Sequence, residues 1–215
     1  MKKIGVIFDL DGTLLDTLED LTDAVNVALE QNGYPKRSLE EVRRFVGNGA
    51  AMLIQRAAPD GAEQEPIMEA FQKWYGQHCQ DKTRPYEGIL EALEILKGKY
   101  PVAVVSNKPD YAVKLIGKTL FPGIHGVGEV QGIPRKPAPD MVWAAMEQIG
   151  VEQCVYIGDS DVDFATAKNA GVPCINVLWG FRDREELEKI GAGCFCEHPS
   201  ELPDLVEEVI SQLNT

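Results

Sequence analysis

The stretch IGVIFDLDGT (residues 4–13) decides the fold of this chain. Its first half is a short run of β-branched and aromatic residues, which predicts a buried strand that ends at Asp9. Asp11, Gly12 and Thr13 follow at once. A parallel sheet collects such polar residues at the carboxyl ends of its strands, where ligands bind. The remaining sequence therefore has to show whether other strands end in the same way.

The composition is that of a globular protein with one domain and a large insertion, or with two domains. The 215 residues are 44% hydrophobic, and 21 basic against 34 acidic residues give a net charge of −13. An acidic chain argues against a nucleic-acid partner. No apolar run approaches the ~20 residues of a membrane helix, and the run at 4–8 is shorter than the ~7 to 15 apolar residues of a signal-peptide core. We expect a cytoplasmic protein without a membrane partner; the oligomeric state stays open.

Residues 16–83 show helical periodicity in four successive segments and contain no strand pattern. Asp16 with Glu19 predicts a capping box at the start of the first segment, and Ser38 with Glu41 predicts another for the second. We interpret this region as a helical cap domain inserted after the first strand. The predicted α/β core domain then consists of residues 1–15 and 84–215.

Strands and helices alternate after this insertion. Further strands are expected at 102–105, 154–157, 174–177 and 194–196. Helical segments are expected before the strand at 102–105, between the first three of these strands, and from Glu201 to the C-terminus. Alternation of this kind predicts an α/β fold with a doubly wound parallel sheet. The glycine-rich segment 123–132 shows no strand pattern.

Polar residues follow several of these strands. Ser106, Asn107 and Lys108 come after the second strand, and Asp159 begins an acidic stretch after the third. Each group alone is equally compatible with a turn, but together they are expected to meet at one edge of the sheet. Two carboxylates ~4 Å apart repel by about 4 kcal/mol at an effective dielectric of ~20, so Asp9 and Asp159 require a cation between them. Oxygen ligands without His or Cys favour Mg²⁺.

These motifs resemble those of the haloacid dehalogenase superfamily of aspartate-nucleophile phosphohydrolases. The first motif is matched by residues 9–17, the second by Ser106, the third by Lys136 and the fourth by residues 158–163. The resemblance spans the whole chain, and the helical insertion resembles the cap of that superfamily. It implies an α/β core and phosphatase activity on a small phosphorylated metabolite.

The resemblance also implies roles for individual residues. Asp9 is expected to attack phosphorus and become a phospho-aspartate, while Asp11 acts as general acid and base. The other implied catalytic residues are Thr13, Ser106 and Lys136, of which the hydroxyls contact phosphoryl oxygens and the lysine offsets charge. The implied Mg²⁺ ligands are Asp9, the Asp11 main-chain carbonyl, Asp159 and Asp163; Asp163 either orders Lys136 or contacts metal-bound water.

Two further segments resemble bacterial phosphoglycolate phosphatases: residues 46–50 in the insertion and residues 179–184 after the fourth strand. This resemblance implies 2-phosphoglycolate as the substrate, and the main-chain amides at the start of the helix at Gly49 are candidates for its carboxylate. A simple helix break is an equal interpretation. The expected substrate-binding residues are Arg44, Gly47, Asn48, Gly49 and Asn107.

Other functions share parts of this pattern. A broad-specificity sugar phosphatase or a pyrophosphatase would use the same motifs. A β-phosphoglucomutase-like enzyme would carry an arginine in the cap loop, which Asn48-Gly49-Ala50 lacks. A phospho-receiver signalling module also places acidic residues and a lysine at strand ends, but receivers are about 120 residues long and have no helical insertion.

Overall fold

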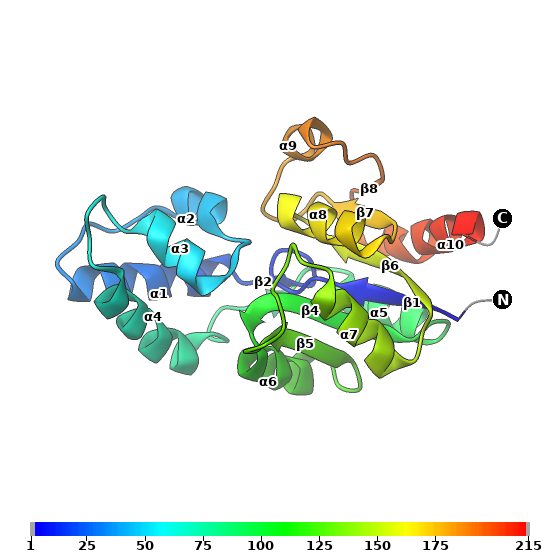
Figure 1. Ribbon diagram of the computed structural model, residues 1–215, viewed down its shortest axis with the longest axis horizontal. Coiled ribbons are helices and arrows are strands. Elements are labelled where there is room, and N and C mark those ends of the chain that lie inside the picture. The colour runs from blue at the N-terminus through cyan, green and yellow to red at the C-terminus, as the bar shows by residue number, and fades with distance from the viewer. Residues whose placement is uncertain (1–2, 214–215) are drawn as a thin grey trace. The chain divides into compact units, whose positions relative to one another are not determined.

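The fold combines an α/β unit with a helical unit, and the computed structural model describes residues 3–213 (Figure 1). The strands are β1 (Ile4–Phe8), β2 (Leu15–Asp16), β3 (Arg84–Pro85), β4 (Val102–Pro109), β5 (His125–Glu129), β6 (Gln153–Gly158), β7 (Cys174–Val177) and β8 (Phe195–Cys196). The helices are α1 (Leu18–Gln31), α2 (Leu39–Phe45), α3 (Gly49–Ala57), α4 (Gln64–His78), α5 (Ile89–Lys97), α6 (Asp110–Leu120), α7 (Asp140–Ile149), α8 (Asp161–Ala170), α9 (Arg184–Lys189) and α10 (Leu202–Leu213), with a 3₁₀ helix η1 (Pro199–Glu201). Within residues 3–213, no helix has the length and apolar character needed to cross a membrane.

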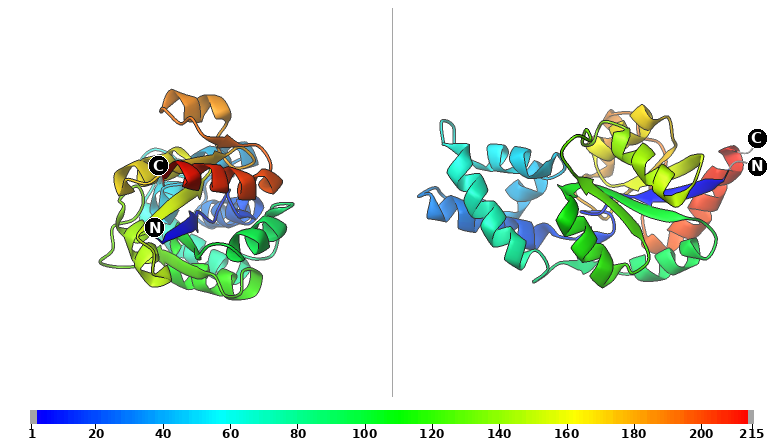
Figure 2. Two further views of the ribbon diagram at one scale, coloured as in Figure 1. Left: turned by 90° about the vertical axis from the view of Figure 1, so that its right-hand side faces the viewer. Right: turned by 60° about the horizontal axis from the view of Figure 1, so that its bottom comes forward.

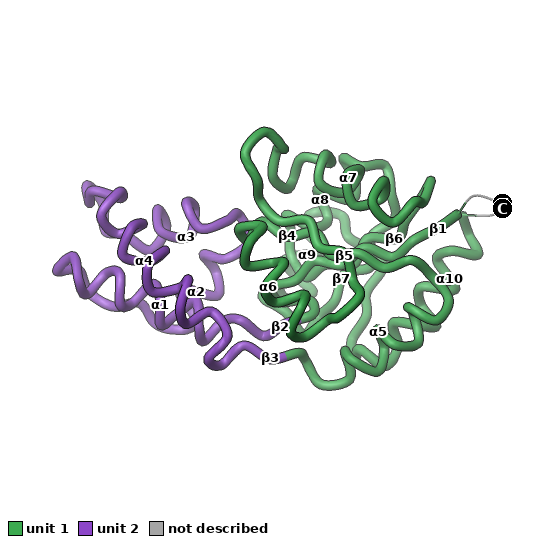
Figure 3. The backbone as a smooth tube through the Cα atoms, turned by 90° about the horizontal axis from the view of Figure 1, so that it is seen from below, with its two compact units in different colours: residues 1–14, 85–215 green, residues 15–84 purple. Residues whose placement is uncertain are grey.

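The chain forms two compact units. One consists of residues 1–14 and 85–215, and the other of residues 15–84 (Figure 3). The short strands β2 and β3 pair with each other where the chain passes between the units. That the helical unit acts as a cap stays a prediction, and we return to it below.

The α/β unit is built on a six-stranded sheet in the order β5-β4-β1-β6-β7-β8. The strand pairs described are parallel, and Phe8 at the end of β1 pairs with Val104 of β4 and Ile157 of β6. The predicted doubly wound parallel sheet is confirmed. Because β1 lies between β4 and β6, the residues that follow these three strands share one edge of the sheet.

Helices cover both faces of this sheet, as the end-on view in Figure 2 shows. Ile7, Val105 and Tyr156 point to the face that carries α7 and α8, where they pack with Met141 and Ala167. The helices α5, α6 and α10 lie on the other face. Both faces are buried, which explains why β1 reads as a continuous apolar run with no polar alternation.

Strand β5 was missed by the sequence analysis, which assigned no strand to residues 123–132. The structure corrects this, because β5 pairs with β4 at the edge of the sheet. A Cβ on Gly126 would overlap Val113 of α6, and one on Gly128 would overlap Asp110. The glycines that hide the strand pattern are therefore required by the close approach of α6.

The helical unit confirms one predicted capping box and corrects another. Ser38 and Glu41 form the expected box at α2. At α1 the N-cap residue is Thr17, which makes no side-chain capping bond. Asp16 lies in β2 instead and its carboxylate is 3.5 Å from Arg84. The prediction for Asp16 with Glu19 was wrong because the pairing of β2 with β3 holds Asp16 in an extended conformation.

The central position of β1 predicts a large stability cost for truncating it. Ile7 is fully buried between β4 and β6, so we expect Ile7→Ala to lower the free energy of unfolding by about 2–5 kcal/mol. Urea denaturation followed by circular dichroism measures this change. The matched control is Leu90→Ala on α5, where Leu90 is 47% exposed and a change within about 0.5 kcal/mol is expected. Similar losses for both variants would contradict the prediction.

Candidate active site

The polar residues expected at the strand ends lie together at the carboxyl edge of the sheet. Asp9 follows β1, Ser106 lies in β4 and Asp159 follows β6. All three are buried, with 7%, 2% and 1% of their surface exposed. The fold therefore places several polar groups out of water at the position where open parallel sheets bind ligands.

Lys136 is the central cation of this cluster. Its Nζ lies 2.7 Å from Oδ1 of Asp9 and 2.8 Å from Oδ1 of Asp163. It also donates a hydrogen bond to the Tyr156 hydroxyl at 3.2 Å, and that hydroxyl donates to Asp163 at 3.1 Å. An ammonium group has three donors, and these three contacts match them.

Asp163 is fully buried and anchors Lys136 to the start of α8. Its Oδ2 accepts hydrogen bonds from the hydroxyl and the main-chain N–H of Ser160, at 2.5 and 3.1 Å. Ser160 and Asp163 thereby form a capping box, and α8 begins at Asp161. Both oxygens of this carboxylate have protein partners.

Asp159 is held by two loops that approach it closely. Its Oδ1 accepts a hydrogen bond from the Thr13 hydroxyl at 3.1 Å, and its Oδ2 accepts one from the Phe181 main-chain N–H at 2.7 Å. A Cβ on Gly12 or Gly180 would overlap the Asp159 carboxylate, and Gly12 has a φ of 84°. Glycine is thus required at both positions.

Asn107 organises the loop that carries Lys136. Its Oδ1 accepts a hydrogen bond from the main-chain N–H of Lys136 at 2.9 Å, and its Nδ2 donates to the main-chain oxygen of Lys136 at 3.1 Å. This pair of bonds connects the end of β4 to the segment before α7. The expected contact between Asn107 and a substrate stays a prediction.

Asp11 lies beside Lys108, a second buried lysine. The Lys108 Nζ is 3.2 Å from Oδ1 of Asp11, and the Lys108 side chain is 3% exposed. The contact is an ion pair without hydrogen-bond geometry, because Asp11 Oδ1 has no hydrogen bond within the described chain. The main-chain N–H of Lys108 donates a hydrogen bond to the Ser106 hydroxyl at 3.2 Å. Lys108 therefore contacts both Asp11 and Ser106 at the end of β4.

Burial and mutual repulsion shift the pKa values of these groups. Burial, followed by the charge of Asp163, raises the pKa of Asp9 well above its ordinary value. The same two causes raise the pKa of Asp159 to about 7. Burial alone would lower the pKa of Lys136, but the charges of Asp163 and Asp9 outweigh it and raise that pKa. The lysine is therefore permanently charged, whereas the carboxylates repel one another.

The cluster has the composition of a site for a hard divalent cation. Asp9, Asp159 and Asp163 each present an oxygen that lies within 4.8 Å of the others. Asp9 and Asp159 are thus close enough to contact a common ion. Burial and the charge of Asp163 disfavour the ionised forms of Asp9 and Asp159, and a divalent cation bound by oxygen ligands would stabilise them.

The other expected substrate-binding residues lie in the helical unit: Arg44, Gly47, Asn48 and Gly49. Asn48 is the N-cap residue of α3, and its Oδ1 accepts a hydrogen bond from Arg56 at 2.7 Å. Arg56 also donates to the main-chain oxygen of Phe45 at 2.8 Å, which fixes the turn between α2 and α3. The side chain of Arg44 is 72% exposed and pairs with Glu40. Substrate contacts by these residues stay predictions.

Sequence reasoning did not single out Tyr156 or assign a role to Lys108. Tyr156 lies in an apolar strand, where a tyrosine is ordinarily a core residue, and no sequence signal reveals that its hydroxyl meets Lys136. Lys108 follows Ser106 in an apparent turn. Trp179, which donates to the main-chain oxygen of Thr13 at 2.9 Å, was noted only through the resemblance.

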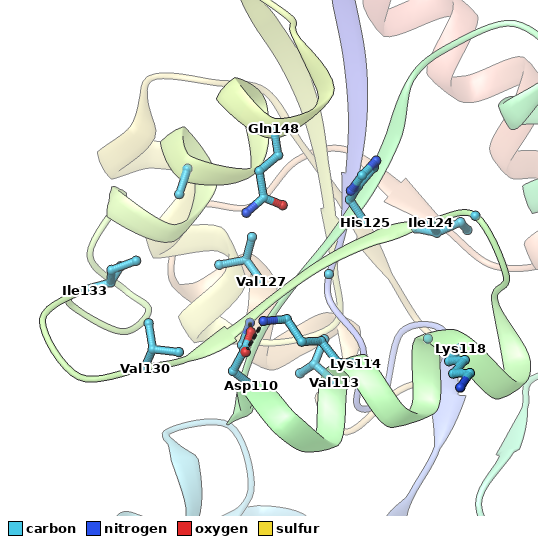
Figure 4. A pocket seen from close by; sticks show the side chains of 15 residues that line it. Asp110, Val113, Lys114, Lys118, Ile124, His125, Val127, Val130, Ile133 and Gln148 are labelled. Atoms are coloured by element: carbon cyan, nitrogen blue, oxygen red, sulfur yellow. Dashed lines mark hydrogen bonds and ion pairs between the residues drawn. The ribbon is translucent and has the colours of Figure 1, made fainter.

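A cavity of about 480 Å³ lies elsewhere in the α/β unit, beside β5 and between α6 and α7 (Figure 4). The Asp110–Lys114 ion pair forms part of one wall, and Val127 and Gln148 line it from β5 and α7. None of the described residues that line it belongs to the expected active site. The acidic cluster around Lys136 is the candidate active site because its carboxylates and its lysine are buried together at the carboxyl edge of the sheet.

A model of haloacid dehalogenase-like hydrolases matches residues 6–177, which include the four motifs at residues 9–17, Ser106, Lys136 and residues 158–163. The protein belongs to this family. The resemblance inferred from the motifs is confirmed, as is the expectation that this hydrolase is an enzyme. The family match favours hydrolysis over a phospho-receiver function.

Similar proteins align with most of this chain. A phosphoglycolate phosphatase from Cereibacter sphaeroides is 36% identical over 220 residues, which are 96% of this chain and 99% of the relative. One from Xanthomonas campestris is 35% identical over 186 residues, which are 83% of this chain and 84% of the relative. A candidate phosphoglycolate phosphatase from Lactobacillus delbrueckii, known from a crystal structure, is 37% identical in sequence and superposes with a TM-score of 0.88. The match covers 96% of this chain and 99% of that chain.

The raised pKa of Asp159 predicts a pH dependence of stability in metal-free protein. With a pKa of about 7 in the folded chain and 3.8 as its ordinary value, this carboxyl binds a proton more tightly when folded. Its contribution to stability is full below about pH 4 and is lost as the pH rises to 7. We therefore expect Asp159→Asn to have a higher Tm than wild type in EDTA at pH 8, by a larger margin than at pH 5. Equal margins at both pH values would contradict this.

Proposed function

We propose that this hydrolase is a phosphatase that acts on a small phosphate monoester and that its substrate is 2-phosphoglycolate. The observation that carries the proposal is the buried contact of Asp9 with Lys136, beside Asp159, at the end of β1. A carboxylate in this position has a cation to orient it and a second acidic group with which to share a metal. Relatives named phosphoglycolate phosphatase, at 36% and 35% identity, support the choice of substrate.

We assign Mg²⁺ as the metal. The side chains of Asp9 and Asp159 and the main-chain carbonyl of Asp11 would hold it, while Asp163 keeps Lys136 in place or contacts metal-bound water. When bound, Mg²⁺ supplies positive charge that neutralises the carboxylates and the phosphoryl oxygens. The acidic cluster and its oxygen-only donors support this choice.

Asp9 is the proposed nucleophile. One of its carboxylate oxygens forms a bond to phosphorus as the bond from phosphorus to the ester oxygen breaks, which leaves a phospho-aspartate and the alcohol. A water molecule then attacks that phosphorus and releases inorganic phosphate, so Asp9 is regenerated. Covalent catalysis divides one displacement into two. The ion pair with Lys136 supports this role because it fixes the carboxylate at 2.7 Å from the ammonium.

Asp11 is the proposed general acid and base. It gives its proton to the departing ester oxygen in the first step and takes one from the attacking water in the second. It lies two residues after the nucleophile, on the loop that leaves β1. Its position supports the role because the loop keeps both carboxylates at the same edge of the sheet.

The remaining groups bind and orient. Lys136 offsets charge on Asp9 and on the phosphoryl group, and Ser106 donates its hydroxyl to a phosphoryl oxygen. Thr13 orients Asp159 through its hydroxyl, and its contact with a phosphoryl oxygen stays an expectation. Asn107 acts by holding the Lys136 loop.

The helical unit is the proposed cap, with residues 16–83 as its extent. A cap limits access of water and contributes contacts beyond the phosphoryl group, so it selects among phosphate esters. The hydrogen bonds of Arg56 to Asn48 and Phe45 support this function because they give the turn before α3 a defined conformation. Arg44, Gly47 and Gly49 belong to the same segment.

The proposed nucleophile gives the first test. Asp9→Asn should reduce kcat for 2-phosphoglycolate at least about a thousand-fold, because an amide oxygen is a poor nucleophile. Chelation of the metal with EDTA should abolish turnover in wild type, and added Mg²⁺ should restore it. Phosphate release at saturating substrate measures both effects.

The matched control for this test is Asp161→Asn. Asp161 is also acidic and follows β6, but its side chain is 51% exposed and pairs with Arg182. Wild-type turnover is expected in this variant. Retained activity in Asp9→Asn would remove the phospho-aspartate from the mechanism.

The proposed cap contacts give a second test. Asn48→Ala and Arg44→Ala should each raise KM for 2-phosphoglycolate more than KM for p-nitrophenyl phosphate, because only the natural substrate has a carboxylate to recognise. Steady-state kinetics on both esters, with pyrophosphate and glucose 6-phosphate in the same panel, measures the effect. Equal changes for the two esters would exclude these residues as specificity determinants, and faster turnover of pyrophosphate or the sugar phosphate would replace the proposed substrate.

A further inference from the structure

Tyr156 carries a hydroxyl group that packing alone does not require. The residue lies in β6 and is fully buried, on the face of the sheet where Ile7, Met141 and Ala167 contribute to an apolar core. A phenylalanine ring would fill the same apolar space. A buried hydroxyl group costs free energy unless it is hydrogen-bonded, so the contacts of this hydroxyl indicate what it does.

The Tyr156 hydroxyl meets the charged groups of the site because Gly158 leaves room for Asp163. Tyr156 and Gly158 are two residues apart in β6 and therefore face the same side of the sheet. A Cβ on Gly158 would overlap Asp163, which belongs to α8. The Asp163 carboxylate thus comes close to the strand, where its Oδ1 accepts a hydrogen bond from the Tyr156 hydroxyl at 3.1 Å.

Lys136 completes a closed set of contacts with these two residues. Its ammonium group donates hydrogen bonds to the Tyr156 hydroxyl at 3.2 Å and to Oδ1 of Asp163 at 2.8 Å. Its third donor is left for Asp9, whose Oδ1 lies 2.7 Å from Nζ. A lysine ammonium is a compact charge with rotatable donors on a flexible stem. When Tyr156 and Asp163 hold two of the donors, the direction of the third is fixed.

The two held donors do not depend on the chemical state of the nucleophile. In the proposed reaction the Asp9 carboxylate becomes an acyl phosphate and is then regenerated, so its contact with Lys136 changes in each step. Tyr156 and Asp163 form and break no covalent bond. Their contacts therefore keep the ammonium group beside the phosphoryl group through both steps.

We propose that Tyr156 is a positioning residue for the reaction. Its hydroxyl, together with Asp163, holds Lys136 so that one donor of the ammonium group points to Asp9 and the phosphoryl group. The inference rests on the proposed function, in which Lys136 offsets charge at the reacting atoms. Because the hydroxyl acts at the phosphoryl end of the substrate, its removal should affect every phosphate monoester equally.

Tyr156→Phe tests the inference because it removes the hydroxyl and keeps the ring. We expect kcat to fall about 10- to 100-fold, as for the loss of a hydrogen bond to a charged group, and by the same factor for 2-phosphoglycolate and p-nitrophenyl phosphate. Val172→Ala is the first control, since it truncates a residue of the same apolar core. Tyr111→Phe is the second, since it removes a hydroxyl from a residue of α6 that is 57% exposed. Both controls should keep the wild-type kcat, although Val172→Ala should lower Tm.

The ¹⁵N resonance of the Lys136 ammonium gives a readout that a merely structural role of Tyr156 would not change. Ammonium protons that are hydrogen-bonded and buried exchange slowly with water, so we expect a sharp signal in wild type and a broadened one in Tyr156→Phe. The signal should stay sharp in Val172→Ala and also in Asp9→Asn, where Tyr156 and Asp163 still hold the lysine. Lys136→Met, which lacks the signal, assigns it.

Several results would overturn the inference. These are an unchanged kcat in Tyr156→Phe, a loss confined to one of the two esters, and a loss of kcat with an unchanged ammonium signal, which would mean that the hydroxyl acts by another route. Broadening of the signal in Asp9→Asn would also overturn it, and this measurement decides the question if Tyr156→Phe does not fold.

The kinetics of wild type separate this inference from the proposed function. If wild type hydrolyses neither ester in Mg²⁺, the proposed function is wrong and the inference falls with it. If wild type is active and Tyr156→Phe is equally active on both esters, only the inference is wrong.

Discussion

The crowding of buried carboxylates around Lys136 is the constraint on which the rest of the active site depends. Two carboxylates ~4 Å apart repel by about 4 kcal/mol at an effective dielectric of ~20, so the fold has to offset their charge wherever it gathers them. The ammonium of Lys136 contacts Asp9 and Asp163 together. Burial and the charge of Asp163 still raise the pKa values of Asp9 and Asp159, although the charge of Lys136 lowers them. This crowding of carboxylates around one lysine favours the binding of a metal cation.

The surrounding structure holds these charges by contacts from distant parts of the chain. The capping box of α8 fixes Asp163, the loop after β7 reaches Asp159 through Phe181, and Asn107 of β4 holds the main chain of Lys136. A parallel sheet makes this convergence possible because successive strands end at the same edge. The geometry of the site thus follows from the strand order and not from a single contiguous motif.

The two compact units have different relations to the proposed reaction. The proposed nucleophile, the proposed proton donor and the acidic cluster all belong to the α/β unit, which would therefore carry the chemistry. The helical unit offers a turn ordered by Arg56, which suits recognition of the part of the ester that varies between substrates.

The sequence by itself determined the α/β class, the acidic residues at the strand ends and the family, because strand periodicity and short polar motifs are local properties of the chain. It did not reveal β5, since the glycines that let this strand approach α6 erase its pattern, and it misplaced the cap of α1 because β2 pairs with a segment about 70 residues away. Only the tertiary structure brought Tyr156 to Lys136 and Lys108 to Asp11. Side-chain partners and shifted pKa values depend on which strands are neighbours and how deeply each group is buried, and neither is encoded in the spacing of residues along the chain.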